Sequence, residues 1–390
     1  MAMNETDFFR RSRRALCRAG ISALLYLADP RDGQAFWQRI FEDGFSVTST
    51  GTWAYVGETN ASGQALIRHD EATERVEAEW DQANLYVGTG DPYTIVASRL
   101  GRSLDFLLDD GDTFRLGARL RLAAGSVPDT TEFYQIANFG LYNLSFMGPD
   151  RMMSDNGAFP PPGTFVKDGS DFVEFNYFIN NRSYGFNPNI QPTIGAHIEG
   201  VDGLYTVGSS GDTGFWHNTD MGEDHWLPTE TDLFVEVIYY GAATNELARR
   251  AHGAIYTDAA RTDLLQVNGV AMYYWTQPVP ADRHFTLTDF AFFNYAGENW
   301  GGPSGCGAGW FDDAYVDRLV PEGELFRAGV EEGRFVAHGA GVSGTVYYLE
   351  FCADLAGGVW TTAAVATASG ETVAFTNAPA GARGSYRVAR

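Results

Sequence analysis

Residues 113–122 read Thr-Phe-Arg-Leu-Gly-Ala-Arg-Leu-Arg-Leu, and this stretch decides the fold class. Phe114, Leu116 and Leu120 fall on one side of an extended chain, whereas Arg115 and Arg119 fall on the other, because successive side chains of a strand point to opposite faces. Period-2 alternation of this kind is typical of a sheet with one buried face and one solvated face. The stretch therefore predicts a strand at the surface of a hydrophobic core.

The rest of the chain repeats this extended pattern. Residues 232–240 are nearly all apolar, which indicates a central strand that is covered on both faces. Clusters of Gly, Asn, Asp and Pro separate the candidate strands, and these residue types favour turns. No helical periodicity appears after Phe45. Many short strands with frequent turns predict an all-β protein, built as a sandwich or a barrel and not from βαβ units. Further strands are expected at 172–179, 285–293 and 346–351.

Composition limits the possible partners. The 390 residues include 27 Lys+Arg and 50 Asp+Glu, which gives a formal net charge of −23. Nucleic acids and anionic membrane surfaces both require a basic protein surface, so we expect neither as a partner. The 44% of hydrophobic residues are enough for a buried core. The chain is therefore expected to be an acidic globular protein.

The N-terminal segment, 1–40, is a leader or extension with a different character. Five arginines between Arg10 and Arg18 precede an apolar run at 19–28, which is the layout of a signal peptide. The run is shorter than the roughly 20 residues that a spanning helix needs, so we expect no membrane insertion. The layout predicts an extracellular, cell-surface or periplasmic protein. An amphipathic N-terminal helix with no targeting role is the alternative.

A domain boundary is expected near 321–324, where Pro, Glu and Gly interrupt the strand pattern. It separates a large domain, 41–320, from a small C-terminal β-sandwich, 325–390. The small unit is of marginal but sufficient size for a fold of its own.

The large domain resembles the concanavalin A-like (laminin G-like) lectin and glucanase jelly rolls. The residues that carry this resemblance are four short segments, at 41–45 with Trp53, 112–114, 134–141 and 311–316. The C-terminal segments 348–351 and 386–388 are similar to small immunoglobulin or fibronectin-like modules. The resemblance implies two facing antiparallel sheets with a concave face and rim loops. It implies no particular reaction, because this architecture hosts lectins, hydrolases, lyases and spacers.

The resemblance also implies a structural calcium ion. In this superfamily a calcium ion often clips the first strand to the last, and calcium prefers six to eight oxygen ligands. The matching positions are Glu42, Asp43, Asp312 and Asp313. The alternative is that these are ordinary acids at strand ends. No other cofactor is expected, because the sequence has no phosphate-binding glycine loop.

Three carboxylates alternate in the string Glu77-Ala78-Glu79-Trp80-Asp81. On a strand they share one face, and alternate residues are roughly 6–7 Å apart, which suits the two carboxylates of a glycoside hydrolase. The order differs from the related glucanase string, and no second copy occurs. We favour the alternative of a solvated strand face in which Arg75 supplies a counter-charge.

The loop 215–226 is the richest in chemistry. An aromatic ring can pack on the apolar face of a sugar while carboxylates and amides bind the hydroxyl groups. The alternative is that these tryptophans only fill the core. The residues expected to bind sugar are Trp216, His217, Asp224, His225 and Trp226, with Trp300 of a separate glycine-rich loop.

The sequence thus favours an exported lectin-like protein that binds a polysaccharide or glycan without altering it. A polysaccharide-cleaving glycoside hydrolase that uses Glu77, Glu79 and Asp81 is the second hypothesis. A structural or adhesive surface module is the third, and it would have a concave face filled by side chains and loops.

Overall fold

The computed structural model describes sixteen segments of the chain. Within these segments every regular element is a β-strand, and no α-helix occurs. The predicted all-β class is therefore confirmed. No described helix is long and apolar enough to cross a membrane. The described residues are 35–46, 52–57, 64–81, 96–124, 134–144, 171–179, 188–198, 201–207, 227–241, 247–296, 306–321, 325–331, 334–352, 360–370, 372–377 and 385–389.

Eight strands form the first sheet, and the pairs β3–β4, β4–β18, β6–β11, β11–β12 and β12–β15 are antiparallel. Its order is β15-β12-β11-β6-β18-β4-β3, and β1 also pairs with β18. The bounds are β1 (Ala35–Asp43), β3 (Ile67–Asp70), β4 (Arg75–Asp81), β6 (Phe114–Leu122), β11 (Leu233–Tyr240), β12 (Arg250–Tyr256), β15 (Tyr273–Trp275) and β18 (Cys306–Pro321).

Eight further strands form the second sheet, again with antiparallel pairs. Its order is β10-β9-β8-β7-β17-β5-β2, and β16 pairs with β9. The bounds are β2 (Ala54–Val56), β5 (Val96–Asp109), β7 (Tyr134–Tyr142), β8 (Phe172–Ile179), β9 (Pro188–Ile198), β10 (Val201–Val207), β16 (Arg283–His284) and β17 (Thr286–Ala296). Two short strands, β13 (Gln266–Val267) and β14 (Val270–Ala271), form a separate hairpin.

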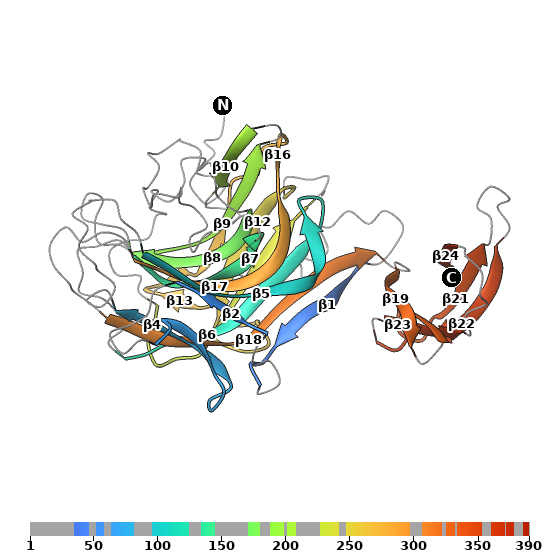
Figure 1. Ribbon diagram of the computed structural model, residues 1–390, viewed down its shortest axis with the longest axis horizontal. Helices are drawn as coiled ribbons and strands as arrows, with labels where there is room; N and C mark the ends of the chain where they lie inside the picture. The colour runs from blue at the N-terminus through green and yellow to red at the C-terminus, as the bar shows by residue number, and fades with distance from the viewer. Residues whose placement is uncertain are drawn as a thin grey trace. The chain divides into compact units, whose positions relative to one another are not determined.

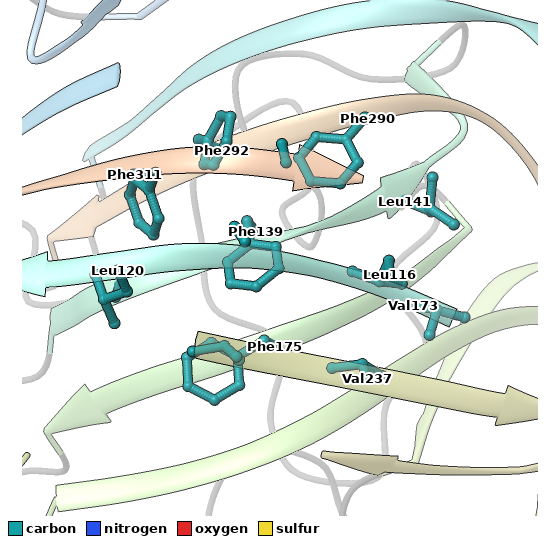
Figure 2. Packing of buried hydrophobic residues seen from close by; sticks show 14 of the residues in the cluster. Leu116, Leu120, Phe139, Leu141, Val173, Phe175, Val237, Phe290, Phe292 and Phe311 are labelled. Carbon is teal, nitrogen blue, oxygen red and sulfur yellow. The ribbon is translucent and has the colours of Figure 1, made fainter. Parts of the chain in front are cut away.

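The two sheets face each other across one hydrophobic core (Figures 1 and 2). Phe292 of β17 and Phe311 of β18 meet between the sheets with ring centroids 4.7 Å apart. Phe139 of β7 lies 5.9 Å from Phe311 and 5.6 Å from Phe175 of β8. These separations are within the favourable range for aromatic pairs. In each sheet the face turned away from this core is called the outer face below.

The strand that decided the fold class behaves as predicted. Phe114, Leu116 and Leu120 are buried in the core, whereas Arg115 and Arg119 lie on the outer face. The predicted strands at 172–179, 232–240, 285–293 and 346–351 are also strands, with small shifts at their ends. β1 begins at Ala35, so the first strand starts inside the segment assigned to the leader.

Contacts between residues divide the chain into two compact units. Ile40–Val316 form most of one unit, and Asp317–Arg390 form most of the other. The second contains two three-stranded antiparallel sheets, β19-β20-β23 and β22-β21-β24, around a small core that includes Tyr347 and Phe375. Its strands are β19 (Leu325–Glu331), β20 (Arg334–Ala340), β21 (Val346–Cys352), β22 (Thr361–Thr367), β23 (Thr372–Asn377) and β24 (Ser385–Ala389).

Candidate functional site

The six residues predicted to bind sugar lie outside the described residues: Trp216, His217, Asp224, His225, Trp226 and Trp300. Their role stays a prediction. The described chain resumes at Leu227, whose backbone amide donates a hydrogen bond of 3.2 Å to the hydroxyl of Tyr177 on β8. Burial raises the pKa of this phenol, so the hydroxyl stays protonated. Tyr177 therefore ties Leu227, which follows the predicted loop in the sequence, to the second sheet.

Glu77 and Glu79 lie on β4 and point to the outer face of the first sheet, because the intervening Ala78 is buried. Glu77 accepts hydrogen bonds from Arg68 at 2.6 Å and Arg75 at 3.0 Å. Glu79 is 3.8 Å from Arg68. Only the backbone of Asp81 is described. The arrangement fits a charge-compensated strand face, and the hydrolase alternative stays a prediction.

More ion pairs continue across this outer face. Arg119 of β6 contacts Asp312 and lies 3.2 Å from Asp313 and 3.7 Å from Asp232. Its guanidinium group also lies over the ring of Trp310, 5.1 Å from the centroid. Burial raises the pKa of Asp312 even though Arg119 pairs with it. Because arginines and acids alternate here, the first sheet presents a charge-paired outer face.

The four residues implied as calcium ligands have other partners or are exposed. Asp43 accepts hydrogen bonds from the Phe45 amide, the Trp53 indole and Arg102, at 2.7, 3.0 and 2.7 Å. Asp312 and Asp313 pair with Arg119, and Glu42 is exposed. Among the described residues no group of three acidic, His or Cys side chains gathers as a metal site requires. A calcium ion at these residues stays a prediction.

A tyrosine and a glutamate meet on the outer face of the first sheet. The hydroxyl of Tyr315 donates a hydrogen bond of 2.7 Å to Glu236 of β11. Arg115 and Arg261 lie 3.7 and 4.0 Å from the same carboxylate. Burial and the charge of Glu236 raise the pKa of Tyr315 well above its ordinary value, so the phenol stays neutral. We call this arrangement the charged pair.

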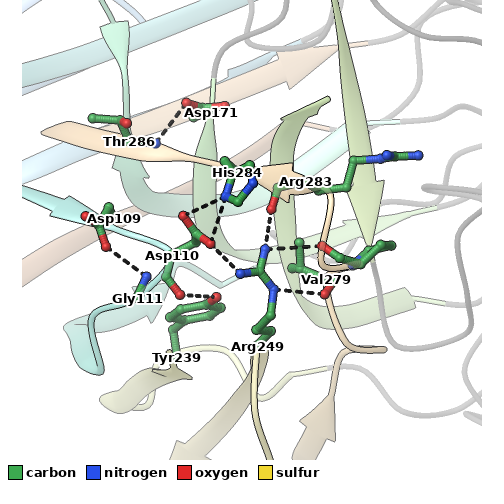
Figure 3. Close-up of polar contacts among 11 residues, drawn as sticks. Asp109, Asp110, Gly111, Asp171, Tyr239, Arg249, Val279, Arg283, His284 and Thr286 are labelled. Atoms are coloured by element: carbon green, nitrogen blue, oxygen red, sulfur yellow. Dashed lines mark hydrogen bonds and ion pairs between the residues drawn. The ribbon is translucent and has the colours of Figure 1, made fainter. Parts of the chain in front are cut away.

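A polar network closes one end of the sandwich around the β5–β6 turn (Figure 3). Asp109 accepts a hydrogen bond of 2.8 Å from the Gly111 amide, and the acidic string 109–112 forms a turn. Arg249 pairs with Asp110 and donates a hydrogen bond of 3.1 Å to the carbonyl of Val279. His284 lies 3.2 Å from the same aspartate. These contacts tie the turn to the segment before β17, and we assign them a structural role.

The candidate site is a group of polar residues on the outer face of the second sheet. It comprises Asn138 and Tyr142 of β7, Glu174 and Asn176 of β8, and Thr193 of β9, and we call it the polar cluster. In the register of the sheet Asn138 is opposite Asn176, and Glu174 is opposite Thr193. All five side chains are buried. The three neighbouring strands thus bring together an acid, two amides and two hydroxyl groups.

Hydrogen bonds connect the cluster. The hydroxyl of Tyr142 donates to Glu174 at 2.8 Å, and its oxygen lies 3.2 Å from the amide oxygen of Asn138. The amide nitrogen of Asn176 donates to Glu174 at 2.8 Å and to Thr193 at 3.0 Å. Polar groups taken out of water need such partners, and hydrogen bonds in a low-dielectric interior strengthen one another.

Aromatic rings flank the polar cluster on the same face. The ring of Tyr142 lies 4.7 Å from Phe293 of β17 and 6.2 Å from Phe172 of β8. Arg99 of β5 is opposite Phe293 in the register and is only partly buried. Burial lowers the pKa of its guanidinium group. Charged, amide, hydroxyl and aromatic groups therefore share one surface of the sheet.

Sequence reasoning identified β8 from its pattern and β7 through the family resemblance, but it identified neither β9 nor the site. Segment 172–179 was predicted as a strand from its apolar residues, yet Glu174 and Asn176 alternate within it. Asn138 occupies the equivalent outer-face position on β7. Polar residues at every second position of an otherwise apolar strand were the available signal. Recognising them as one site required knowledge of which strands are neighbours.

The arrangement is suited to recognition of a polyhydroxylated ligand. Amides donate and accept hydrogen bonds, carboxylates accept them, and hydroxyl groups do both, so together they match the mixed pattern of a sugar. Aromatic surface beside a few placed polar groups is typical of small-molecule sites.

No protein-family model matches this sequence, and no curated protein matches it either. Solved structures with a similar fold include peanut lectin, which aligns over 74% of this chain and 99% of its own, at 12% identity and a TM-score of 0.33. The Emp47p carbohydrate recognition domain aligns over 74% and 99%, at 10% identity and a TM-score of 0.35. Alginate lyase vAL-1 from Chlorella virus aligns over 70% and 95%, at 12% identity and 0.33. Similarity at this level assigns no activity, ligand or site.

Proposed function

We propose that this chain is an exported carbohydrate-binding protein that holds its ligand without cleaving it. The observation that carries the proposal is the polar cluster, in which Glu174, Asn176 and Asn138 converge from neighbouring strands beside aromatic rings. The basic and apolar leader supports export. The large excess of acidic residues supports a ligand other than nucleic acid.

The site offers the ligand a strong hydrogen-bond acceptor and side chains that are already held in position. The carboxylate of Glu174 is the strongest acceptor in the cluster, since hydrogen bonds to ionised groups exceed neutral ones in strength. The amide of Asn176 already bridges Glu174 and Thr193, so these three side chains hold one another in place. A preorganised set of this kind lowers the entropic cost of binding.

The test is saccharide binding by the full chain. A panel of cellohexaose, mannohexaose and oligoalginate is titrated calorimetrically against the wild type and Glu174→Gln, with Glu236→Gln as the control. The control makes the same change at a buried glutamate of the first sheet. We expect wild type and control to bind one of these sugars equally, and Glu174→Gln to bind at least about tenfold more weakly, since a charged hydrogen bond contributes about 1.5–3 kcal/mol.

Two results would contradict the proposal. If folded Glu174→Gln binds sugar as strongly as the wild type does, the polar cluster is not the binding site. If the wild type binds no sugar of the panel and none on a wider glycan array, the proposed carbohydrate-binding function is wrong.

A second candidate function is a structural or adhesive module without a sugar ligand. The observation that favours it is the burial of the whole polar cluster, including Glu174 and Asn176, in the structure. The same titration separates the two functions, because a structural module binds none of the sugars.

A further inference from the structure

Four ring-bearing side chains gather on the outer face of the first sheet, at the end that carries β15. They are Tyr240 of β11, His252 of β12, and Tyr273 and Trp275 of β15, and we call them the aromatic cluster. In the register His252 is opposite Trp275, and Ala254 is opposite Tyr273. The sheet order places these three strands side by side. The cluster therefore lies on the opposite side of the sandwich from the polar cluster.

The rings are close enough to form one surface. Tyr240 and Trp275 stack with centroids 5.8 Å apart and planes inclined by 24°. The imidazole of His252 lies 4.8 Å from Trp275 and 5.0 Å from Tyr273. Tyr240, Tyr273 and Trp275 are partly exposed, and β15 is an edge strand of the described sheet. The cluster thus presents aromatic faces that a ligand can reach.

His252 gives this surface an unsatisfied polar atom. Its Nδ1 lies 3.3 Å from the hydroxyl of Tyr240, whereas its Nε2 is buried and has no hydrogen-bond partner among the described residues. The side chain is 3% exposed, and burial lowers its pKa to about 3, so the ring is neutral. Buried polar atoms are nearly always paired in native proteins, and an exception calls for a missing partner.

The described acid near the cluster is already compensated, which disfavours a cationic ligand. Glu236 is the acid that acts on Tyr240 and Tyr256. Its carboxylate already accepts a hydrogen bond from Tyr315 and is paired with Arg115 and Arg261. Among the residues that the structure describes, Glu236 therefore offers no uncompensated negative charge to a cation, although aromatic rings alone would also attract one.

We infer that the aromatic cluster is a second carbohydrate contact, at which one pyranose ring stacks on Trp275 and one of its hydroxyl groups pairs with Nε2 of His252. The ring of Tyr273, inclined by 75° to that of Trp275, contacts the edge of the sugar. Because this nitrogen is buried, a partly exposed ring of the edge strand rotates to admit the hydroxyl, as surface side chains do within nanoseconds. The inference rests on the proposed function, but it uses residues of the other sheet.

The experiment compares two tryptophans on the same outer face. Full-length wild type, Trp275→Ala and Trp310→Ala are titrated with cellohexaose and mannohexaose, and saturation-transfer NMR reports whether the sugar lies on aromatic protons. Trp310 is the matched control, because it lies between Arg75 and Arg119 outside the aromatic cluster. We expect Trp275→Ala to bind sugar at the aromatic cluster at least about tenfold more weakly than the wild type does. Trp310→Ala should stay within about twofold of wild type.

The outcomes separate this inference from the proposed function. If Trp275→Ala binds as wild type does while Glu174→Gln loses binding, the second contact is overturned and the proposed function stands. If Trp275→Ala loses one binding site while Glu174→Gln loses another, both the second contact and the proposed function stand. Displacement of the sugar by tetramethylammonium chloride at equal concentration would overturn the inference in favour of a cation site. Trp275→Phe, which keeps a ring, replaces Trp275→Ala if that variant does not fold, and should weaken the site about threefold.

Discussion

Each sheet carries on its outer face a buried glutamate that accepts a hydrogen bond from a tyrosine. On the first sheet the pair is Tyr315 with Glu236, at 2.7 Å, and two arginines lie within 4.0 Å of the carboxylate. On the second sheet the pair is Tyr142 with Glu174, at 2.8 Å, and the amide of Asn176 donates to the same acid.

The comparison shows two ways of keeping an acid out of water. Arginine partners compensate the charge of Glu236 directly, so this carboxylate is committed to the architecture of its sheet. Around Glu174 the polar cluster supplies amide and hydroxyl groups, which can exchange their hydrogen bonds for those of a polyhydroxylated ligand. The same residue type therefore contributes to stability on one face and, in our proposal, to recognition on the other.

The largest effect is expected from removing the acid of the charged pair. Glu236→Ala should lower the free energy of unfolding by about 3 kcal/mol, because it leaves a phenol and two arginines without their acceptor. Glu236→Gln should lose less, since the amide oxygen still accepts from Tyr315. Urea unfolding of the three proteins measures the difference. If Glu236→Ala were as stable as wild type, charge compensation would not be what holds this face.

A smaller effect is expected from pH at His252. Its pKa is lowered to about 3 by burial, so between pH 6 and 3 the unfolded chain binds a proton that the folded chain does not. Stability should therefore fall as the pH falls through this window, by up to about 1.4 kcal/mol per pH unit. His252→Phe should have a correspondingly shallower dependence than wild type. An equally steep dependence in His252→Phe would show that the burial of this histidine is not the cause.

The smallest effect is expected at the predicted carboxylates of β4. Glu77→Gln and Glu79→Gln should each cost less than about 1 kcal/mol, because their arginine pairs are partly exposed and screened by solvent. Sugar binding should be unchanged in both variants. Neither the variants nor the wild type should release reducing ends from polysaccharide. Release by the wild type that Glu79→Gln abolishes would restore the hydrolase hypothesis.

The sequence alone determined the class of fold and several of the strands. The alternation around Phe114 and Leu116 and the apolar run of β11 were readable because the side-chain period of a strand is a local property of the backbone. The acidic turn before Thr113 was also readable, because the preference of Asp and Gly for turns is likewise a local property. The role of Glu77 as one of several charge-paired surface acids also followed from its neighbours in sequence.

Only the tertiary structure decided which side chains meet. Tyr315 and Glu236 are 79 residues apart, Arg119 and Asp312 are 193 apart, and Tyr142 and Glu174 are 32 apart. Such contacts depend on strand order and register, which no local pattern specifies. A one-residue change of register would move Glu174 from the outer face into the core. The polar cluster and the aromatic cluster each form because a sheet aligns polar or aromatic residues from separate strands.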